Sequence, residues 1–339
     1  MSGNRIVRTK TIDGVVTPAF IHNGPSYFFV NLPVYADGLV NCWELVDLPL
    51  FKKKLRQGWV TTAVPDGQEI HVHGLGSWTI VDGDWPCSAT KFFKRVTELV
   101  RELNPRMENL HDCHGRTVEK VGKVQVSILG SPKEQPARLT QPGPFAKRIK
   151  GDNVSVFVRV DDVLYLADLR AFADGVIELG RLPSPETLDI EQLKRAIEQG
   201  HVCSSLAAGS RVEIHQLGSF TVREEQWSTE IQDILRGVPD LIDAANGRPD
   251  SVQRCRRAFE AYRADPTETT REALRIAYEA VPRHKRIYVG DMDTKDTAVR
   301  MILYGDREIE GWSYRIVARA QGVRGKRLPT ITVPKPKKR

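Results

Sequence analysis

The chain has 339 residues, of which 40% are hydrophobic and 27% are charged, and this composition excludes a disordered, collagen-like or coiled-coil chain. No apolar run approaches the about 18 residues of a membrane span, and no signal-peptide core occurs. We therefore expect a soluble protein of the cytoplasm, with enough chain for two or three domains and no membrane partner.

The net charge of +7 is distributed unevenly along the chain. Residues 251–339 hold 21 Lys and Arg against 11 Asp and Glu, whereas residues 1–250 hold 29 against 32. This asymmetry predicts that the C-terminal region meets an acidic partner, either nucleic acid or an acidic protein.

The cysteines are odd in number and contain no Cys-x-x-Cys pair; they are Cys42, Cys87, Cys113, Cys203 and Cys255. This pattern argues against a disulfide framework and against a thiolate zinc site. A reducing compartment fits it best.

The sequence repeats itself at offsets of 137 and 142 residues. The matching segments are YADGLV (35–40) with FADGVI (172–177), Gln57-Gly58 with Gln199-Gly200, HGLGSWTI (73–80) with HQLGSFTV (215–222), and Trp85 with Trp227. The shared positions are mostly glycines, apolar residues and turn formers, which a common backbone requires. We expect two copies of one module, at about 20–104 and 157–246.

Each copy predicts a β-rich α+β unit. Asp-Gly between apolar runs indicates a hairpin with a type I′ turn, so strands should flank it. Helices are expected at 50–57 and 190–199, the second capped by Asp189, with Gly58 and Gly200 as stops. Strands should follow at 60–64, 69–73 and 77–81. Apolar residues at helical spacing then predict a final helix with Phe92, Phe93, Val96, Leu99, Val100 and Leu103 on one face; Gly237-Val238-Pro239 should break its second copy.

The fold class that follows is α+β, with two tandem copies of a small SH3-like or curled-sheet module before a mainly helical C-terminal region. We expect the first repeat with its N-terminal extension at 1–130, including a strand at 124–129. A Pro-rich linker should span 131–150 and the second repeat 151–246. The helical domain should span 247–322, and the Pro- and Lys-rich tail, 323–339, should be mobile.

Helical periods dominate after residue 247. Helices are expected at 251–264 and 269–280, where Thr269 and Glu272 match a capping box. A short strand should cover 286–289. Helices at 294–304 and 307–321 should follow, each preceded by a capping Asp and ended by a glycine.

The segment YVGDMDTKD (288–296), continued by RMILYGD (300–306) and EIEGWS (308–313), resembles a block found in a family of uncharacterised bacterial proteins. The resemblance covers the C-terminal third and extends to the repeats. It implies a bacterial origin and the domain division above, and it implies no activity.

Three aspartates form the best enzymatic candidate. Asp291, Asp293 and Asp296 follow the expected strand, where loop carboxylates commonly bind Mg²⁺ for phosphoryl chemistry. The spacing departs from the haloacid-dehalogenase pattern, because Lys295 stands where Thr or Val is required. The competing interpretation is helix capping by Asp293, with Asp296 adding favourable charge to the first turn, and it is the stronger one.

Histidines offer a weaker metal candidate. His71 and His73 are two apart on an expected strand and should share a face, near the sequence His-Asp-Cys-His at 111–114. The second copy has Glu213 and His215 at the matched positions and no counterpart of the His-Asp-Cys-His sequence. We therefore expect His73 and His215 to be structural and to bind no metal.

Aromatic and basic residues alternate near the C-terminus, where we expect an exposed binding face. Its candidate residues are Trp312, Arg315, Arg319, Arg324, Lys326 and Arg327. Arg315 and Arg319 are four apart and so share a helical face, along which a phosphate backbone would lie. A merely solvated basic face explains the pattern equally well. No phosphate-binding glycine motif occurs, since Gly74-Leu75-Gly76 lacks the third glycine of a dinucleotide fingerprint.

The sequence thus favours a non-enzymatic recognition or scaffold protein that binds nucleic acid or an acidic protein through its basic C-terminal region, with no cofactor. The alternative is a metal-dependent nuclease or phosphatase centred on Asp291, Asp293 and Asp296, with Mg²⁺ as its cofactor.

Overall fold

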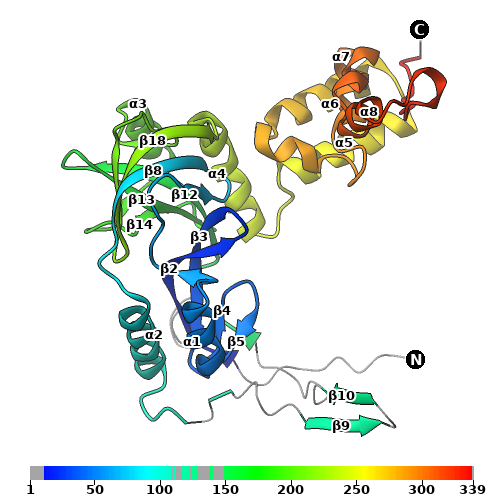
Figure 1. The fold of residues 1–339 in the computed structure, drawn as a ribbon. Coiled ribbons are helices and arrows are strands. Elements are labelled where there is room, and N and C mark those ends of the chain that lie inside the picture. Colours follow the sequence, from blue (N-terminus) through cyan, green and yellow to red (C-terminus); the bar gives the residue numbers. More distant parts are fainter. Residues whose placement is uncertain are drawn as a thin grey trace.

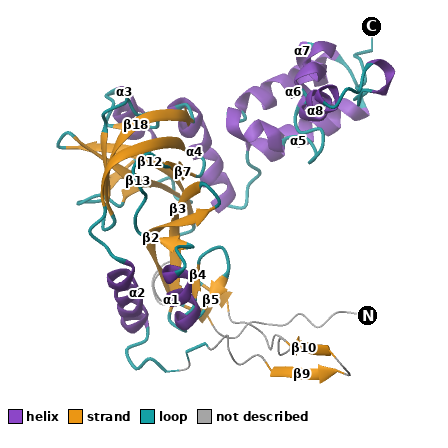
Figure 2. Ribbon diagram, viewed as in Figure 1, coloured by secondary structure: helices purple, strands orange, loops and turns teal. Residues whose placement is uncertain are grey.

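The computed structural model describes residues 11–108, 110–111, 117–121, 124–128, 137–139 and 149–337. Strands dominate up to residue 228, and helices dominate the C-terminal region (Figure 2). The described part of the chain contains no helix that is long and apolar enough to cross a membrane. The expected change from a β-rich to a mainly helical region is confirmed.

The β-rich region consists of two halves with the same order of elements. The first half contains β2 (Gly14–Asn23), β3 (Ser26–Tyr35), β4 (Val40–Asn41), β5 (Leu45–Val46), α1 (Leu48–Arg56), β6 (Val60–Thr61), β7 (Glu69–Val72), β8 (Gly76–Asp84) and α2 (Ala89–Leu103). The second half contains β12 (Gly151–Val160), β13 (Val163–Phe172), β14 (Ile177–Gly180), β15 (Glu186–Leu188), α3 (Ile190–Glu198), β16 (Val202–Cys203), β17 (Arg211–Ile214), β18 (Gly218–Ser228) and α4 (Ile231–Ala245).

Strand pairing is also the same in the two halves. In the first half β2 pairs antiparallel with β3 and β6, β3 pairs parallel with β7, and β7 pairs antiparallel with β8. In the second half β12, β13, β16, β17 and β18 make the corresponding pairs. The last strands of the halves, β8 and β18, pair with each other through three register shifts. The described strands of both halves therefore form one 14-stranded mixed sheet rather than two separate sheets, because this pairing covers two edges that would otherwise be open.

Two small strand pairs accompany the large sheet. β1 (Thr11–Ile12) pairs parallel with β11 (Ala137–Arg138), and β9 (Thr117–Val121) pairs antiparallel with β10 (Val124–Ile128). The strand expected at 124–129 is thus present as β10. Most of the linker expected at 131–150 lies outside the described residues.

The Asp-Gly hairpins form as expected, but their turn is of another type. Only the glycines, Gly38 and Gly175, have positive φ, whereas a type I′ turn needs positive φ at both central residues. In both hairpins the glycine N–H bonds back three residues, at 2.9 Å, and the Asp side chain accepts from the N–H two residues on. This is a three-residue loop that ends in a left-handed glycine.

The helices of the two halves have matching ends. Asp47 caps α1 and Asp189 caps α3, and Gly58 and Gly200 follow with φ of +74° and +72°. After α2 and α4, Asn104 and Asn246 donate to the carbonyls of Ala36 and Ala173 at 3.0 and 2.7 Å.

The expected break at Gly237-Val238-Pro239 is wrong, because α4 runs without interruption through Pro239. The apolar face of α4 spans the proline, with buried Ile234 on one side and Leu241 on the other. Packing of this face on β12 and β13 holds both turns in place and offsets the lost backbone hydrogen bond.

Two hydrophobic cores stabilise the β-rich region. One lies under α1 and α2 and draws on the first half alone. The other joins the halves, and within it the ring of Trp78 meets that of Phe157 edge to face at 5.1 Å. Figure 1 shows α1 and α2 at the end of the sheet remote from the C-terminal helices, and α4 on the side facing them.

The C-terminal region contains α5 (Ser251–Ala264), α6 (Glu268–Ala280), η1 (Arg283–Tyr288), α7 (Thr297–Tyr304), η2 (Asp306–Gly311), α8 (Ser313–Ala320) and η3 (Gly325–Arg327). The capping box of α6 uses Thr267 and Thr270 instead of Thr269 and Glu272. The strand expected at 286–289 is wrong, since η1 is a 3₁₀ helix there. The helix expected at 307–321 is divided into η2 and α8, because Trp312 adopts extended backbone angles and turns inward.

The expectation of a mobile tail is wrong for the described residues up to 337. Val333 packs on the core of α5, α6 and α7, and the carbonyl of Pro334 accepts a 2.9 Å hydrogen bond from Tyr262. The Lys337 N–H donates to the carbonyl of Pro266 at 2.8 Å. Alternating prolines keep the tail extended, so that its intervening residues reach the helices.

Candidate functional site

The three aspartates of the enzymatic hypothesis each serve the local fold. Asp291 Oδ1 accepts from the backbone N–H and the hydroxyl of Thr294 and from the backbone N–H of Asp293, and these bonds lower the pKa of Asp291. Asp293 accepts from Tyr314 at 3.0 Å, and Asp296 accepts from Tyr278 at 2.6 Å. Across the described residues, no group of three or more His, Cys, Asp and Glu side chains is arranged to hold a metal ion.

The histidine candidates have separate surroundings. His71 stacks on Phe28 at 5.1 Å and lies 3.7 Å from a Glu69 oxygen, whereas His73 follows the end of β7 and lines a cleft. His215 follows the end of β17, the corresponding strand. Residues 112–114 of the His-Asp-Cys-His sequence lie outside the described residues.

The basic face expected near the C-terminus is only partly available. Arg315 and Arg319 both form ion pairs with Glu310. Trp312 is buried, contrary to the expected exposure, and its Nε1 donates to the carbonyl of Asp293 at 2.9 Å. Arg319 stays exposed beside Glu310, and Arg324, Lys326 and Arg327, in and beside η3, are exposed as well.

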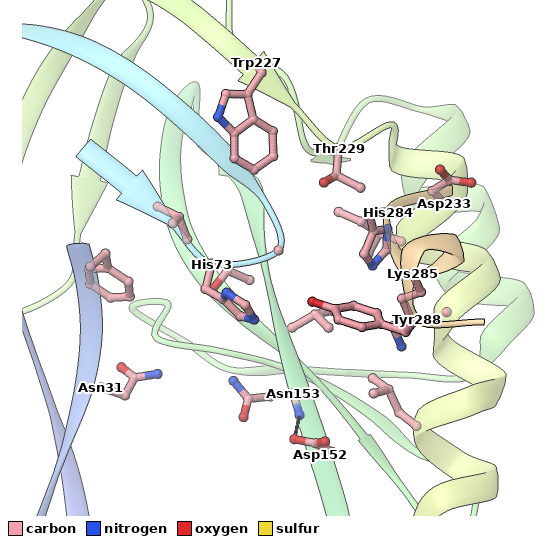
Figure 3. Close-up of a pocket in the computed structure, with 18 residues that line it drawn as sticks. Asn31, His73, Asp152, Asn153, Trp227, Thr229, Asp233, His284, Lys285 and Tyr288 are labelled. Atoms are coloured by element: carbon pink, nitrogen blue, oxygen red, sulfur yellow. Dashed lines mark hydrogen bonds between the residues drawn. The ribbon is translucent and has the colours of Figure 1, made fainter. Parts of the chain in front are cut away.

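The structure places another set of candidate side chains around a cleft of about 620 Å³ between the β-rich region and the C-terminal helices. Figure 3 shows its labelled residues converging from strands of both halves, from α4 and from η1. Asn31 comes from β3, Asn153 from β12, Trp227 from β18, and His73 from the turn after β7; η1 supplies His284, Lys285 and Tyr288. The cleft volume lies within the range of about 300–1,000 Å³ that is typical of ligand sites.

Hydrogen bonds and ion pairs attach η1 to α4 and thereby form one wall of the cleft. The backbone N–H of Arg283 donates to Asp233 at 3.0 Å, and its side chain pairs with Glu230 at 2.6 Å. At the other end of α4, Asp240 accepts from the N–H of Ser251 at 2.7 Å. These contacts keep η1 against the β-rich region.

Aromatic rings are unusually accessible in the cleft. The side chains of Trp227 and Tyr288 are 52% and 56% exposed. Trp85, which matches Trp227 in the first half, instead donates its Nε1 to the carbonyl of Val64 and packs against Phe20 and Phe220. The exposure of Trp227 is therefore not a consequence of the shared fold.

The charge of the cleft is mainly positive beside η1. Lys285, His284 and His73 lie there together, and burial lowers the pKa of His284, with further lowering by Lys285 and His73 and an opposing effect of Asp233. Asp233 itself is buried and pairs with Arg236. The free cation at this wall is Lys285, which has no ion pair within the described chain.

Two carboxamides form the opposite end of the cleft and are held by a buried ion pair. Arg181 pairs with Asp168 at 2.5 Å and donates to Asn31 Oδ1 at 2.8 Å. The Asn153 amide donates to Asp168 at 3.2 Å. This network joins the two halves of the β-rich region.

These cleft residues are not among the candidates that the sequence predicts for a functional site. Trp227 and His73 were assigned to the fold because they have matches in the other half. The run Arg-His-Lys-Arg-Ile-Tyr at 283–288, which mixes cations with an aromatic, is the available signal, but its last residues fall in the strand predicted at 286–289.

Comparisons with family models gave two matches. Residues 3–107 and 140–249 match the model described as Domain of unknown function (DUF7638), and residues 250–323 match Domain of unknown function (DUF7639). The boundary between the two matches falls between α4 and α5. Comparisons with curated proteins and with solved structures found no match.

Proposed function

The chain belongs to the family described as Domain of unknown function (DUF7638), whose description gives no activity, and we propose that it recognises nucleic acid without catalysing a reaction. In this proposal a single-stranded segment lies in the cleft. The observation that carries it is the convergence of two half-exposed rings, Trp227 and Tyr288, on the cationic wall of η1. Single strands are bound by aromatic rings on which bases stack and by cations that attract phosphates.

Charge beyond the cleft supports the same proposal. The exposed Arg324, Lys326 and Arg327 remain candidates for binding, as sources of long-range attraction rather than of a fixed contact surface. The excess positive charge of residues 251–339 predicts salt-sensitive affinity, because each neutralised phosphate releases a counterion. An acidic protein would use the cations but has no general need for the exposed rings.

We also propose that the β-rich region, which forms most of the cleft, is a tandem duplication. It is supported by the equal strand pairing, the matched hairpins and the matched helix ends of the two halves, and by the two separate segments of the DUF7638 match. The domain division predicted from the sequence is retained as part of this proposal. The docking of residues 331–337 favours counting the tail with the helical domain. A bacterial origin and a cytoplasmic location stay predictions.

Fluorescence anisotropy with labelled single-stranded DNA, single-stranded RNA and duplex DNA, across a salt series, tests the proposal. Single strands should bind more tightly than duplex. Trp227→Ala should weaken single-strand binding by about 1–3 kcal/mol, the range for loss of one stacking ring. Trp43→Ala is the matched control, because Trp43 is 54% exposed and lies outside the cleft, and it should bind as the unaltered protein does.

Three outcomes would contradict the proposal. Absence of salt-sensitive binding to every probe would favour an acidic protein as the partner. Equal losses of single-strand affinity in Trp227→Ala and Trp43→Ala would show that the cleft is not the binding site. Magnesium-dependent cleavage that Asp291→Asn abolishes would replace recognition by the nuclease alternative.

A further inference from the structure

We propose that the cleft binds a nucleotide unit in one fixed orientation, with its base against Asn31 and Asn153 and its phosphate against Lys285 and His284. This inference rests on the proposed function and specifies which part of the nucleic acid each end of the cleft recognises. Figure 3 shows the two carboxamides at one end, His284 and Lys285 at the wall formed by η1, and His73 between them.

The orientation of Asn31 is fixed by the chemistry of its neighbours. Arg181 can only donate hydrogen bonds, so the Asn31 oxygen must face it, at 2.8 Å. The ionised Asp168 can only accept, so the Asn31 nitrogen must face the carboxylate, at 3.4 Å from Oδ2. Asn31 is thereby held with both polar atoms engaged, since its nitrogen also lies 3.5 Å from Asp168 Oδ1.

Asn153 is oriented by the same carboxylate. Its Nδ2 donates to Asp168 Oδ1 at 3.2 Å, which turns its Oδ1 away from Asp168. That oxygen makes no hydrogen bond to any part of the chain that the structure describes. Asn153 thus offers a free acceptor oxygen and its second N–H at a fixed position, which suits the edge of a base.

The carboxamide end is unfavourable for phosphate. The charge of Arg181 is compensated by Asp168, and both side chains are buried, with 13% and 4% exposed. Asp152, an exposed carboxylate beside Asn153, adds negative charge at this end of the cleft. An anion is therefore repelled here, whereas a neutral base is not.

The wall at η1 is favourable for phosphate. Lys285 carries a full positive charge, and His284 and His73 offer ring nitrogens close to it. Asp233, the nearby carboxylate, already pairs with Arg236 and accepts from the Arg283 backbone. The two ends of the cleft therefore differ in sign, and Trp227 and Tyr288 give a base its stacking surface between them.

Arg181 is the positioning residue for this arrangement. Its backbone has a φ of +59°, uncommon for a residue other than glycine, and its guanidinium lies 4.6 Å from the centre of the Phe29 ring. From that position one side chain holds Asp168 and Asn31 together. Lysine keeps the charge but lacks the planar fork that makes both bonds.

The test compares two probes, each of about eight nucleotides, which lies within the usual site size for single strands. One probe carries bases and the other is abasic throughout, with the same phosphates. The unaltered protein should bind the first probe about tenfold more tightly, because only that probe can stack and hydrogen-bond. Both probes should show the same salt slope, which is the slope of the logarithm of affinity against the logarithm of salt concentration.

Two variants should then separate the ends of the cleft. Asn153→Ala should reduce the ratio of the affinity for the base-carrying probe to the affinity for the abasic probe, and it should leave the salt slope unchanged. Lys285→Ala should leave the ratio unchanged and make the slope shallower by roughly 0.7, the value for one phosphate of a single strand. The controls are Asn23→Ala and Lys53→Ala, which alter exposed residues of the same types outside the cleft and should change neither measure.

Arg181→Lys extends the test to the positioning role. It should reduce the ratio as Asn153→Ala does while the salt slope persists, and a thermal melt identifies loss of folding. If that variant unfolds, Asn153→Ala decides alone. The fixed orientation would be overturned if Asn153→Ala left the ratio of probe affinities unchanged, or if Asn153→Ala and Lys285→Ala reduced the salt slope equally. Recognition of nucleic acid would stand in either case. Failure of both probes to bind would instead overturn the proposed function.

Discussion

At the residue scale, the ion pair between Arg181 and Asp168 has an energetic weight that can be measured. Arg181→Met should lower the free energy of unfolding by about 3–5 kcal/mol, because it leaves the Asp168 carboxylate buried without its cation. Arg170→Met is the matched control. Arg170 of β13 pairs with Glu178 of β14 at 3.1 Å, but about a third of each side chain is exposed, so this pair is not buried. That change should cost at most about 1 kcal/mol in urea unfolding. Similar losses in the two variants would show that burial does not govern this pair.

His284 gives the cleft a dependence on pH. Because its pKa is lowered in the folded protein by burial, then by Lys285 and His73 against the opposing Asp233, the unfolded chain binds the proton more readily. Stability is therefore fully present above the ordinary histidine pKa of about 6.5 and is lost as pH falls through that value toward the folded pKa.

Urea unfolding at a series of pH values between about 7.5 and 5 tests this dependence, since the range brackets the ordinary histidine pKa. The free energy of unfolding should fall with pH, and His284→Gln should reduce the fall. His215→Gln, at a histidine outside the cleft, should retain it. Nucleic-acid affinity should move in the opposite direction, because protonation adds positive charge to the wall at η1. If stability fell with pH to the same extent in His284→Gln, the assignment of this pH dependence to His284 would be wrong.

Single residues also show where reasoning from the sequence fails. Trp85 and Trp227 match in the repeat, and a shared position is ordinarily a sign of a structural role. Trp85 is structural, since it bonds to Val64 and packs in the core, but Trp227 is half exposed beside η1. Trp85 packs against Phe220 of the second half, whereas Trp227 lines the cleft beside the C-terminal region, and no local pattern near either residue reveals this difference.

At the scale of elements, the tail is held by contacts whose removal can be measured. Val333→Ala should lower the stability of the helical region by about 1 kcal/mol, because the side chain packs on the core of α5, α6 and α7. Val317→Ala, in the exposed part of α8, is the control and should stay within about 0.5 kcal/mol of the unaltered protein.

Hydrogen exchange of α5 and α6 supplies the measurement for the tail. Their amides should exchange faster in Val333→Ala than in Val317→Ala. Unchanged exchange in Val333→Ala would show that the tail contributes nothing to the helical region, as a mobile tail would. The prolines and lysines of the tail predict mobility from composition, and that prediction fails because Tyr262 and Pro334, which are 72 residues apart, meet only in the fold.

Elements with local signals were predicted well. α5 was placed from its period, and the hairpins, both ends of α3 and the C-terminal end of α1 follow from Asp and Gly at fixed spacing, whereas α1 begins two residues before its predicted start. The errors lie where tertiary contacts prevail over local preference. The packed face of α4 carries it through Pro239, and contacts with α4 hold η1 as a 3₁₀ helix where a strand was predicted at 286–289.

At the scale of the whole molecule, the cleft could not be predicted because its residues come from segments that are distant in sequence. Asn31 and Tyr288 are separated by most of the chain, and periodicity carries no information on their proximity. The repeat predicts two similar halves, but it does not predict that β8 and β18 pair to form one sheet. This pairing brings Asn31 of one half next to Asp168 of the other.

The two halves should consequently unfold together. Trp78 belongs to the first half, yet its ring contacts Phe157 and its Nε1 donates to Glu225 at 3.0 Å, both in the second half. Trp78→Ala should lower stability by about 3–5 kcal/mol, because it leaves a cavity in the core that the halves share. In hydrogen exchange, β3 and β13 should lose protection to the same extent, since a cooperative unit opens as a whole. Leu274→Ala, which alters the separate core of the C-terminal helices, should speed exchange in α5 and α6 and leave β3 and β13 protected. If Trp78→Ala instead exposes β3 while β13 stays protected, the halves are independent folding units that touch, and the continuous sheet is not what makes the β-rich region a single body.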